Sequence, residues 1–306
     1  MNNVFTTTLN QMLVFFIIMI VGYILSKKKI VDGNADQAIS SILAFAIGPA
    51  LSFKTFYENF KPDILGEKLP IILYSFAILF GLILLSLCLT RFFTKDDYLK
   101  KIVFYSLIMG NYGYIGYPLT EAVFGSEALF NMMLFCIPLN LFVFTIAFPV
   151  LNPNLKKFSL KAVINPPFIA MVIGMIVGYF NIKMPAFIET ASSSLSSCMG
   201  AMAMLMTGIV IAKYNFKEIV LNLKFFIASL FRLVIIPACL LVILRLFNVP
   251  QMVQLASLCS YAIPMGLNTV IFPAAFGGDT KPGASMALIS NILGVITIPI
   301  MFAIFA

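Results

Sequence analysis

The stretch Leu69–Thr90, LPIILYSFAILFGLILLSLCLT, runs for 22 residues without a charged side chain. A helix needs about 20 apolar residues to cross the roughly 30 Å hydrocarbon core of a bilayer. Comparable uncharged runs follow one another along the whole chain, which is 61% hydrophobic and only 10% charged. Soluble domains carry about 25% charged residues. The sequence therefore predicts an all-α membrane protein that crosses the bilayer many times.

About ten transmembrane helices are expected from these runs. The runs are Leu9–Ser26, Ala38–Phe53, Leu69–Thr90, Ile102–Thr120, Ala128–Leu151, Ala162–Ile182, Thr190–Ala212, Phe225–Leu244, Met252–Phe276 and Gly283–Ala306. The first run has no basic residue before it and no small-residue cleavage pattern after it, so we read it as a retained helix and not as a signal peptide. We expect a multi-pass protein of the plasma or inner membrane.

The basic residues indicate how the chain is oriented in the bilayer. The net charge is +8, yet the Lys and Arg residues lie in short loops between apolar runs, which argues against a nucleic-acid partner. The odd-numbered loops carry 14 of these residues and the even-numbered loops carry 5. Because positive charge is retained on the cytoplasmic side, both termini are expected outside.

Enzyme chemistry has little support in this composition. The chain has no histidine, and its five cysteines fall singly inside apolar runs, where we expect them to pack and not to bind metal. A catalytic constellation and an attached signalling domain are both missing from the sequence, which argues against an intramembrane enzyme or receptor. We expect no enzyme, no cofactor and no metal site.

An internal repeat is visible in the sequence. The heptapeptide Ile17–Tyr23, IIMIVGY, recurs as Ile173–Tyr179, IGMIVGY, with six of seven positions identical. The two copies lie in the first and sixth expected helices. We therefore predict two five-helix repeats, residues 1–155 and 156–306. An odd number of spans per repeat inverts the second copy, an architecture that recurs in secondary transporters.

Two spans are expected to be broken. The fourth contains Gly110–Pro118, GNYGYIGYP, and the ninth contains Tyr261–Asn268, YAIPMGLN. A proline cannot donate the helical hydrogen bond, so each helix should kink or unwind at Pro118 and at Pro264. The half-helices that begin there would meet with their N-terminal ends, which favour an anion. The alternative is that these residues only kink packed helices.

The candidate substrate-binding residues follow from these breaks. They are Asn111, Gly113, Gly116, Pro118, Pro264, Gly266, Asn268 and Arg232. Arg232 lies inside the eighth span, where a charge is costly, and two readings stay open: a counter-ion for the substrate, or a side chain that reaches to the membrane surface. No Asp or Glu lies centrally in a span. Coupling to Na⁺, coupling to H⁺ and uncoupled transport all stay open.

At the two broken helices the chain resembles the auxin efflux carrier family, which includes plant auxin carriers and bacterial malate permeases. The resemblance rests on Gly110–Leu119, on Ala262–Asn268, and on the later Asp279 and Ser290–Pro299. It implies ten helices in two inverted repeats, a scaffold bundle, a transport domain that crosses at the two prolines, elevator-like alternating access, and a carboxylate held near Asn111.

This chain departs from the family pattern in two places. Ala201-Met202-Ala203 stands in the seventh helix where the family often has proline, which puts any ion site on that helix in doubt. The long loop of the plant carriers is replaced by Asn152–Lys161, so regulation through such a loop does not carry over.

Together these features predict a secondary transporter of small organic anions, such as malate or auxin-like acids, that works by alternating access. The alternative is a sodium- or proton-coupled symporter or exchanger with the bile-acid-symporter-like fold. The expected partners are a small organic anion and the lipid bilayer, with a homodimer as an open alternative.

Overall fold

The computed structural model describes residues 2–151, 164–215, 223–275 and 278–306, and in these residues it is helical with no β-strand beyond one isolated bridge. Helices occupy each of the ten expected runs. In chain order they are α1 (Asn2–Lys27), α2 (Ala35–Ile42), η1 (Leu43–Ile47), α3 (Gly48–Asn59), η2 (Pro62–Ile64), α4 (Leu65–Phe93), α5 (Asp97–Ile108), η3 (Tyr112–Gly116), α6 (Tyr117–Phe124), α7 (Ser126–Phe142), η4 (Val143–Ala147), α8 (Phe148–Leu151), α9 (Pro166–Tyr179), α10 (Ala186–Ser197), α11 (Met199–Ala212), α13 (Leu223–Leu230), η6 (Phe231–Ile235), α14 (Ile236–Leu246), α15 (Gln251–Tyr261), α16 (Asn268–Ala275) and α17 (Lys281–Phe305). The predicted boundary between residues 155 and 156, the loop Asn152–Lys161 and the loop residue Lys217 lie outside the described residues.

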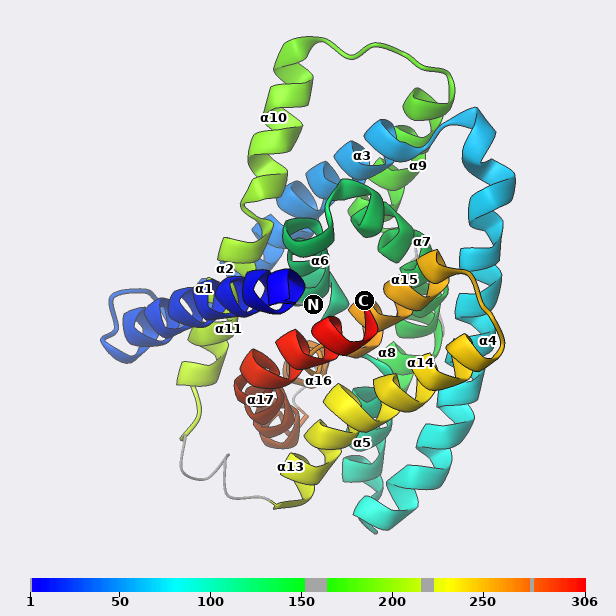
Figure 1. Ribbon diagram of the computed structural model, residues 1–306. Coiled ribbons are helices and arrows are strands. Elements are labelled where there is room, and N and C mark those ends of the chain that lie inside the picture. The colour runs from blue at the N-terminus through cyan, green and yellow to red at the C-terminus, as the bar shows by residue number, and fades with distance from the viewer. Residues whose placement is uncertain (1, 152–163, 216–222, 276–277) are drawn as a thin grey trace.

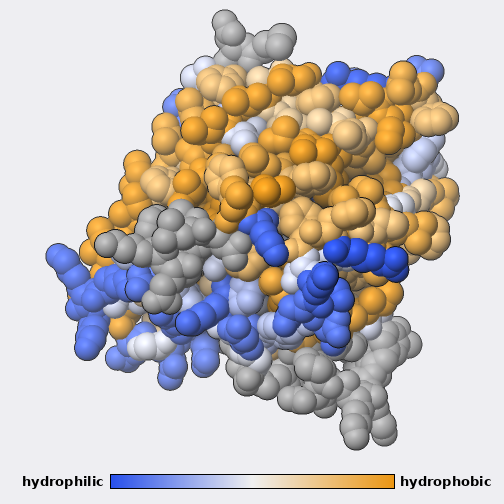
Figure 2. Space-filling view, turned by 90° about the horizontal axis from the view of Figure 1, so that it is seen from below, coloured by the Kyte–Doolittle hydropathy of each residue, from blue (hydrophilic) through white to orange (hydrophobic). Residues whose placement is uncertain are grey.

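The outer surface of the molecule is apolar, as a lipid-facing surface must be. In the described part, seven helices are long and apolar enough to cross a membrane, and α9 is a shorter apolar helix. Large side chains such as Phe45, Phe80 and Ile296 are 71%, 64% and 65% exposed. Figure 2 shows a face that is mostly hydrophobic, with hydrophilic residues gathered along one margin. The predicted all-α, multi-pass membrane protein is confirmed.

The helices pack as two bundles (Figure 1). In the first, called here the scaffold bundle, α1 packs along α11, and α3 packs against α9 and α10. In the second, the crossover bundle, α7 contacts α4, α6 and α15, while α17 contacts α13 and α16. The two bundles meet where α1 packs against α17 and where α11 packs against η3. The scaffold and transport domains that the resemblance implies stay a prediction.

Glycines set the close packing inside the scaffold bundle. A side chain at Gly22 would collide with the backbone carbonyl of Leu205 in α11, and one at Gly178 would lie 2.6 Å from the backbone carbonyl of Phe60, at the end of α3. Small residues let membrane helices approach this closely. Gly22 and Gly178 are the same position of the repeated heptapeptide, so the two copies make equivalent contacts. The inverted repeat itself stays a prediction.

In the part of the chain that the structure describes, four helical stretches contain a π-helical turn, and each turn ends two residues before a proline. The turns η1, η3, η4 and η6 precede Pro49, Pro118, Pro149 and Pro237. A proline ring clashes with the carbonyl four residues earlier in an α-helix. The wider turn changes this spacing, as in the bonds from Gly48 N to Leu43 O and from Tyr117 N to Tyr112 O, which span five residues. The prolines therefore distort these helices without ending them.

Candidate substrate site

The two interrupted helices cross each other inside the protein. Helix α5 ends at Ile108 and α15 ends at Tyr261, and the segments that follow form an antiparallel bridge between Gly110 and Met265. Asn111 N donates a hydrogen bond of 2.8 Å to Pro264 O. Met265 N donates to the Ser290 hydroxyl at 3.0 Å. Unwound backbone is tolerated at membrane depth only where protein or a cavity surrounds it, and this crossover meets that condition.

Two glycines make the crossing close. A side chain at Gly110 would collide with Arg232 Nη2 and would lie 2.8 Å from the side chain of Ile263. A side chain at Gly266 would lie 3.2 Å from the carbonyl oxygen of Gly110. Gly266 therefore allows the two backbones to approach each other.

The break in the fourth span lies earlier than expected. The sequence places it at Pro118, whereas the chain leaves the helix at Met109 and re-enters it at Tyr112. Pro118 lies in the first turn of α6, directly after η3, and a side chain at Gly200 would contact its ring at 3.2 Å. In the ninth span, Pro264 does lie in the unwound segment between α15 and α16. The wide turn absorbs the effect of Pro118, so the break forms at the crossing.

The two candidate asparagines differ in their partners. Asn111 is 5% exposed, and its side-chain Nδ2 has no hydrogen-bond partner among the described residues. Asn268 is half-buried, and its Nδ2 donates to the Tyr105 hydroxyl at 2.7 Å. Since an unpaired buried donor is costly, Asn111 is the asparagine that is free to bind a ligand.

Arg232 is completely buried beside the crossover. It is 0% exposed, its Nη2 donates to Ser260 O at 3.1 Å, and its guanidinium carbon lies 5.1 Å from the ring centre of Tyr261. No carboxylate among the described residues forms an ion pair with it, and its Nε and Nη1 have no hydrogen-bond partner there. The reading in which Arg232 reaches to the membrane surface is therefore wrong.

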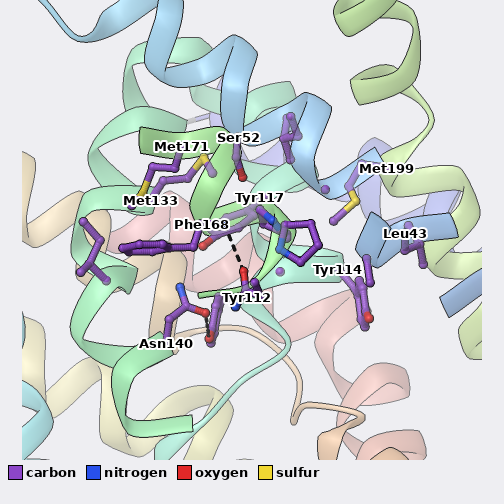
Figure 3. Close-up of a pocket in the computed structure, with 18 of the residues that line it drawn as sticks. Leu43, Ser52, Tyr112, Tyr114, Tyr117, Met133, Asn140, Phe168, Met171 and Met199 are labelled. Atoms are coloured by element: carbon purple, nitrogen blue, oxygen red, sulfur yellow. Dashed lines mark hydrogen bonds between the residues drawn. The ribbon is translucent and has the colours of Figure 1, made fainter. Parts of the chain in front are cut away.

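A cavity of about 380 Å³ lies between the bundles, next to the crossover (Figure 3). Its walls come from η1, α3, η3, α6, α7, η4, α9 and α11, so three of the four described π-turns line it. Most of the lining is apolar or aromatic, and none of the lining residues is charged. The polar residues in the wall are Ser52, Tyr112, Tyr114, Tyr117, Asn140 and Asn165.

The polar groups of the cavity are held in place by hydrogen bonds. The Tyr112 hydroxyl donates to Asn140 Oδ1 at 2.9 Å, and Asn140 Nδ2 donates to Cys136 O at 3.0 Å. Asn165 Oδ1 accepts from Phe168 N at 3.0 Å, which caps the N-terminus of α9. The Asn140 amide is therefore fixed at the cavity wall between Tyr112 and Cys136.

The cavity includes only part of the predicted site. Gly113 lines it, and a side chain there would meet no atom within 4 Å. A side chain at Gly116 would instead lie 2.7 Å from Met132 and 3.2 Å from Ile263, so this residue serves packing. Asn111 and Arg232 lie at the crossover and do not line the cavity.

Sequence reasoning missed most of the cavity wall. Asn140 is one of two amides, with Asn131, in a largely apolar run, and its polarity could have marked it. Asn165 stands before two prolines, a pattern that is typical of a helix start and does not indicate a binding site. Residues such as Leu43 and Met199 carry no signal of their own, because only packing brings their helices to one wall.

Comparison with known proteins agrees with this architecture. The profile described as "Membrane transport protein" matches residues 7–302. The chain is also 24% identical over 305 residues to a protein of Methanocaldococcus jannaschii named "Uncharacterized transporter MJ1031", a match that covers 95% of this chain and 96% of the relative. The resemblance to the auxin efflux carriers is thereby confirmed, and the chain belongs to the membrane transport protein family.

Proposed function

We propose that this protein is a secondary carrier of small organic anions, with carboxylates such as malate or auxin-like acids as the substrate class. The observation that carries the proposal is the cavity beside the crossover, where the helix Tyr112–Phe124 begins. The first N–H groups of a helix have no partner within it, and they carry positive partial charge. A carboxylate is the ligand that such a helix end favours.

The residues of the cavity support this chemistry. Gly113 lines the cavity without a side chain, so a ligand can approach its backbone there. The Asn140 amide is held at the wall by hydrogen bonds, and the unpaired Nδ2 of Asn111 lies directly before the helix that contains Gly113. Aromatic side chains such as Phe144 and Phe168 would enclose the apolar part of the substrate. We assign Asn111 and Gly113 to the substrate, and Gly116, Pro118, Pro264, Gly266 and Asn268 to the shape of the crossover.

The proposed transport cycle is alternating access by movement of one bundle against the other. Polar links between the bundles include the ion pair from Lys54 to Glu121 at 3.4 Å and the hydrogen bond from Tyr214 to Thr280 at 2.8 Å. Exposed ion pairs contribute about 1 kcal/mol or less, so such links can break during a cycle. We further propose the inverted repeats 1–155 and 156–306, a plasma-membrane location, and both termini outside.

Transport in liposomes tests the proposal. The purified protein is reconstituted, and uptake of labelled malate and of labelled indole-3-acetate is measured under separate sodium and pH gradients. We expect uptake of at least one acid above empty liposomes. Stimulation by one gradient would identify the coupling ion, and failure of both acids to enter would contradict a carboxylate carrier. The same detergent preparation gives the oligomeric state, for which a homodimer stays open.

Gly113→Leu should block this uptake. The new side chain would extend into the cavity and compete with the substrate, and overpacking of a site costs about 1–3 kcal/mol, or about tenfold in flux or more. Gly81→Leu is the matched control, because a side chain at Gly81 also meets no atom within 4 Å but faces outward from α4. Equal uptake by the two variants would show that the cavity is not the substrate site.

A further inference from the structure

The buried guanidinium of Arg232 needs an explanation that a carboxylate does not supply. Insertion of a charge at the centre of a membrane helix is costly. Such residues normally pair with an acid, yet no described carboxylate forms an ion pair with Arg232. The negative charge that holds it must come from another source.

The ends of two half-helices supply that negative charge. Helix α15 ends at Tyr261, and Ser260 O, which accepts a hydrogen bond from Arg232 Nη2, is a carbonyl of its last turn. Helix α5 ends two residues before Gly110, and a side chain at Gly110 would collide with the same Nη2. The guanidinium therefore lies at two helix C-termini at once.

The partial charges of the two helix ends are together equal in size to the charge of Arg232. Each helix C-terminus carries about −0.5 of an elementary charge, so two of them offset one guanidinium. The face of the Tyr261 ring adds a cation–π contact, which is stronger when both groups are removed from water. Gly110 leaves the space that this arrangement needs.

We propose that Arg232 is a resident cation of the crossover: its guanidinium neutralises the converging C-termini of α5 and α15 and holds the two interrupted helices together. The crossover then needs no bound metal ion to be stable. Removal of the side chain would create a vacant site for a small planar cation. This inference does not rest on the proposed substrate, because it concerns the stability of the empty protein.

Two variants of similar volume separate charge from packing. Arg232→Lys keeps the charge and Arg232→Met removes it, and thermal stability is measured in detergent, without any carboxylate, by size-exclusion chromatography after heating. We expect Arg232→Met to melt roughly 6 °C or more below wild type and Arg232→Lys to lose less than half of that. Equal melting temperatures for the two variants would overturn the proposal.

Arg245 provides a matched control. Its Nη2 donates to Phe305 O, at the end of α17, at 2.8 Å, and its guanidinium carbon lies 5.1 Å from the ring centre of Phe305, but it is exposed. The contacts are the same in kind and lie in water, so Arg245→Met should melt close to wild type. A loss as large as that of Arg232→Met would show that any carbonyl contact of an arginine has this effect.

Chemical rescue tests the vacant site directly. Methylguanidinium ion at millimolar concentration should raise the melting temperature of Arg232→Ala and leave wild type and Arg245→Ala unchanged. Sodium at the same concentration controls for ionic strength. No rise in Arg232→Ala, or an equal rise in all three proteins, would contradict a cation site at the crossover. If Arg232→Ala cannot be purified, the Lys and Met pair decides.

Discussion

Replacement of Asn111 with alanine is expected to abolish substrate flux while the protein stays folded in the membrane. The Nδ2 of Asn111 is buried without a hydrogen-bond partner, and a buried donor in that state costs about 1–3 kcal/mol. Its removal should therefore leave the empty protein as stable as wild type or more stable. The backbone contact to Pro264 O does not involve the side chain and should persist. Liposome uptake and the melting temperature are measured on the same preparation.

Asn131 is the matched control for this experiment. It is 7% exposed and its Oδ1 is unpaired, yet it lies in α7, outside both the cavity wall and the bridged segments of the crossover. Asn131→Ala should keep flux within about twofold of wild type, because no substrate contact is removed. Wild-type uptake by Asn111→Ala would remove the crossover amide from the site, and equal losses in both variants would point to a general effect of buried amides.

Replacement of Gly208 with leucine should prevent the scaffold bundle from forming. A side chain at Gly208 would collide with the carbonyl of Met19 and would lie 2.7 Å from Tyr23 N, both in the backbone of α1. Backbone cannot move aside as a flexible side chain can, so we expect a loss of about 3 kcal/mol or more. The yield of monodisperse protein after extraction and its melting temperature measure the effect. Gly81→Leu, on the outer face of α4, should behave as wild type.

The same glycine-to-leucine substitution can be made where α9 packs against α3. A side chain at Gly174 would lie 2.6 Å from Phe53 O in α3, so Gly174→Leu should be as damaging as Gly208→Leu. A folded protein from either leucine variant would contradict the view that the two helix pairs are held at glycine contact distance.

The membrane spans could be predicted because the length of an uncharged run is a local property. Leu69–Thr90 was predicted as a span, and α4 covers Leu65–Phe93. The crossover was predicted only in part. Proline marks a helix that is under strain, but the place where the fourth span opens depends on the pairing of Gly110 with Met265, which lies far away in the sequence. Pro118 was a misleading marker because η3 accommodates it.

The environment of Arg232 could not be predicted for a similar reason. Its depth in the span is compatible with a buried guanidinium and with one that reaches to the surface. Whether the guanidinium is buried depends on the space beside the Cα of Gly110 and on the carbonyl of Ser260. Other helices bring both of these to Arg232. The cavity wall is likewise a product of packing, since Asn140, Asn165 and Met199 belong to three different helical stretches.

The prolines that follow the π-turns have a consequence for motion. A π-turn accommodates one extra residue in an α-helix. In a helix without proline, the position of the π-turn could shift along the helix axis. Here a ring two residues downstream blocks that migration, because a regular turn would drive it into the carbonyl four positions earlier. Each π-turn therefore stays at a fixed position relative to its proline. A bound substrate should therefore meet the same turns η3 and η4 while the crossover bundle moves past η1.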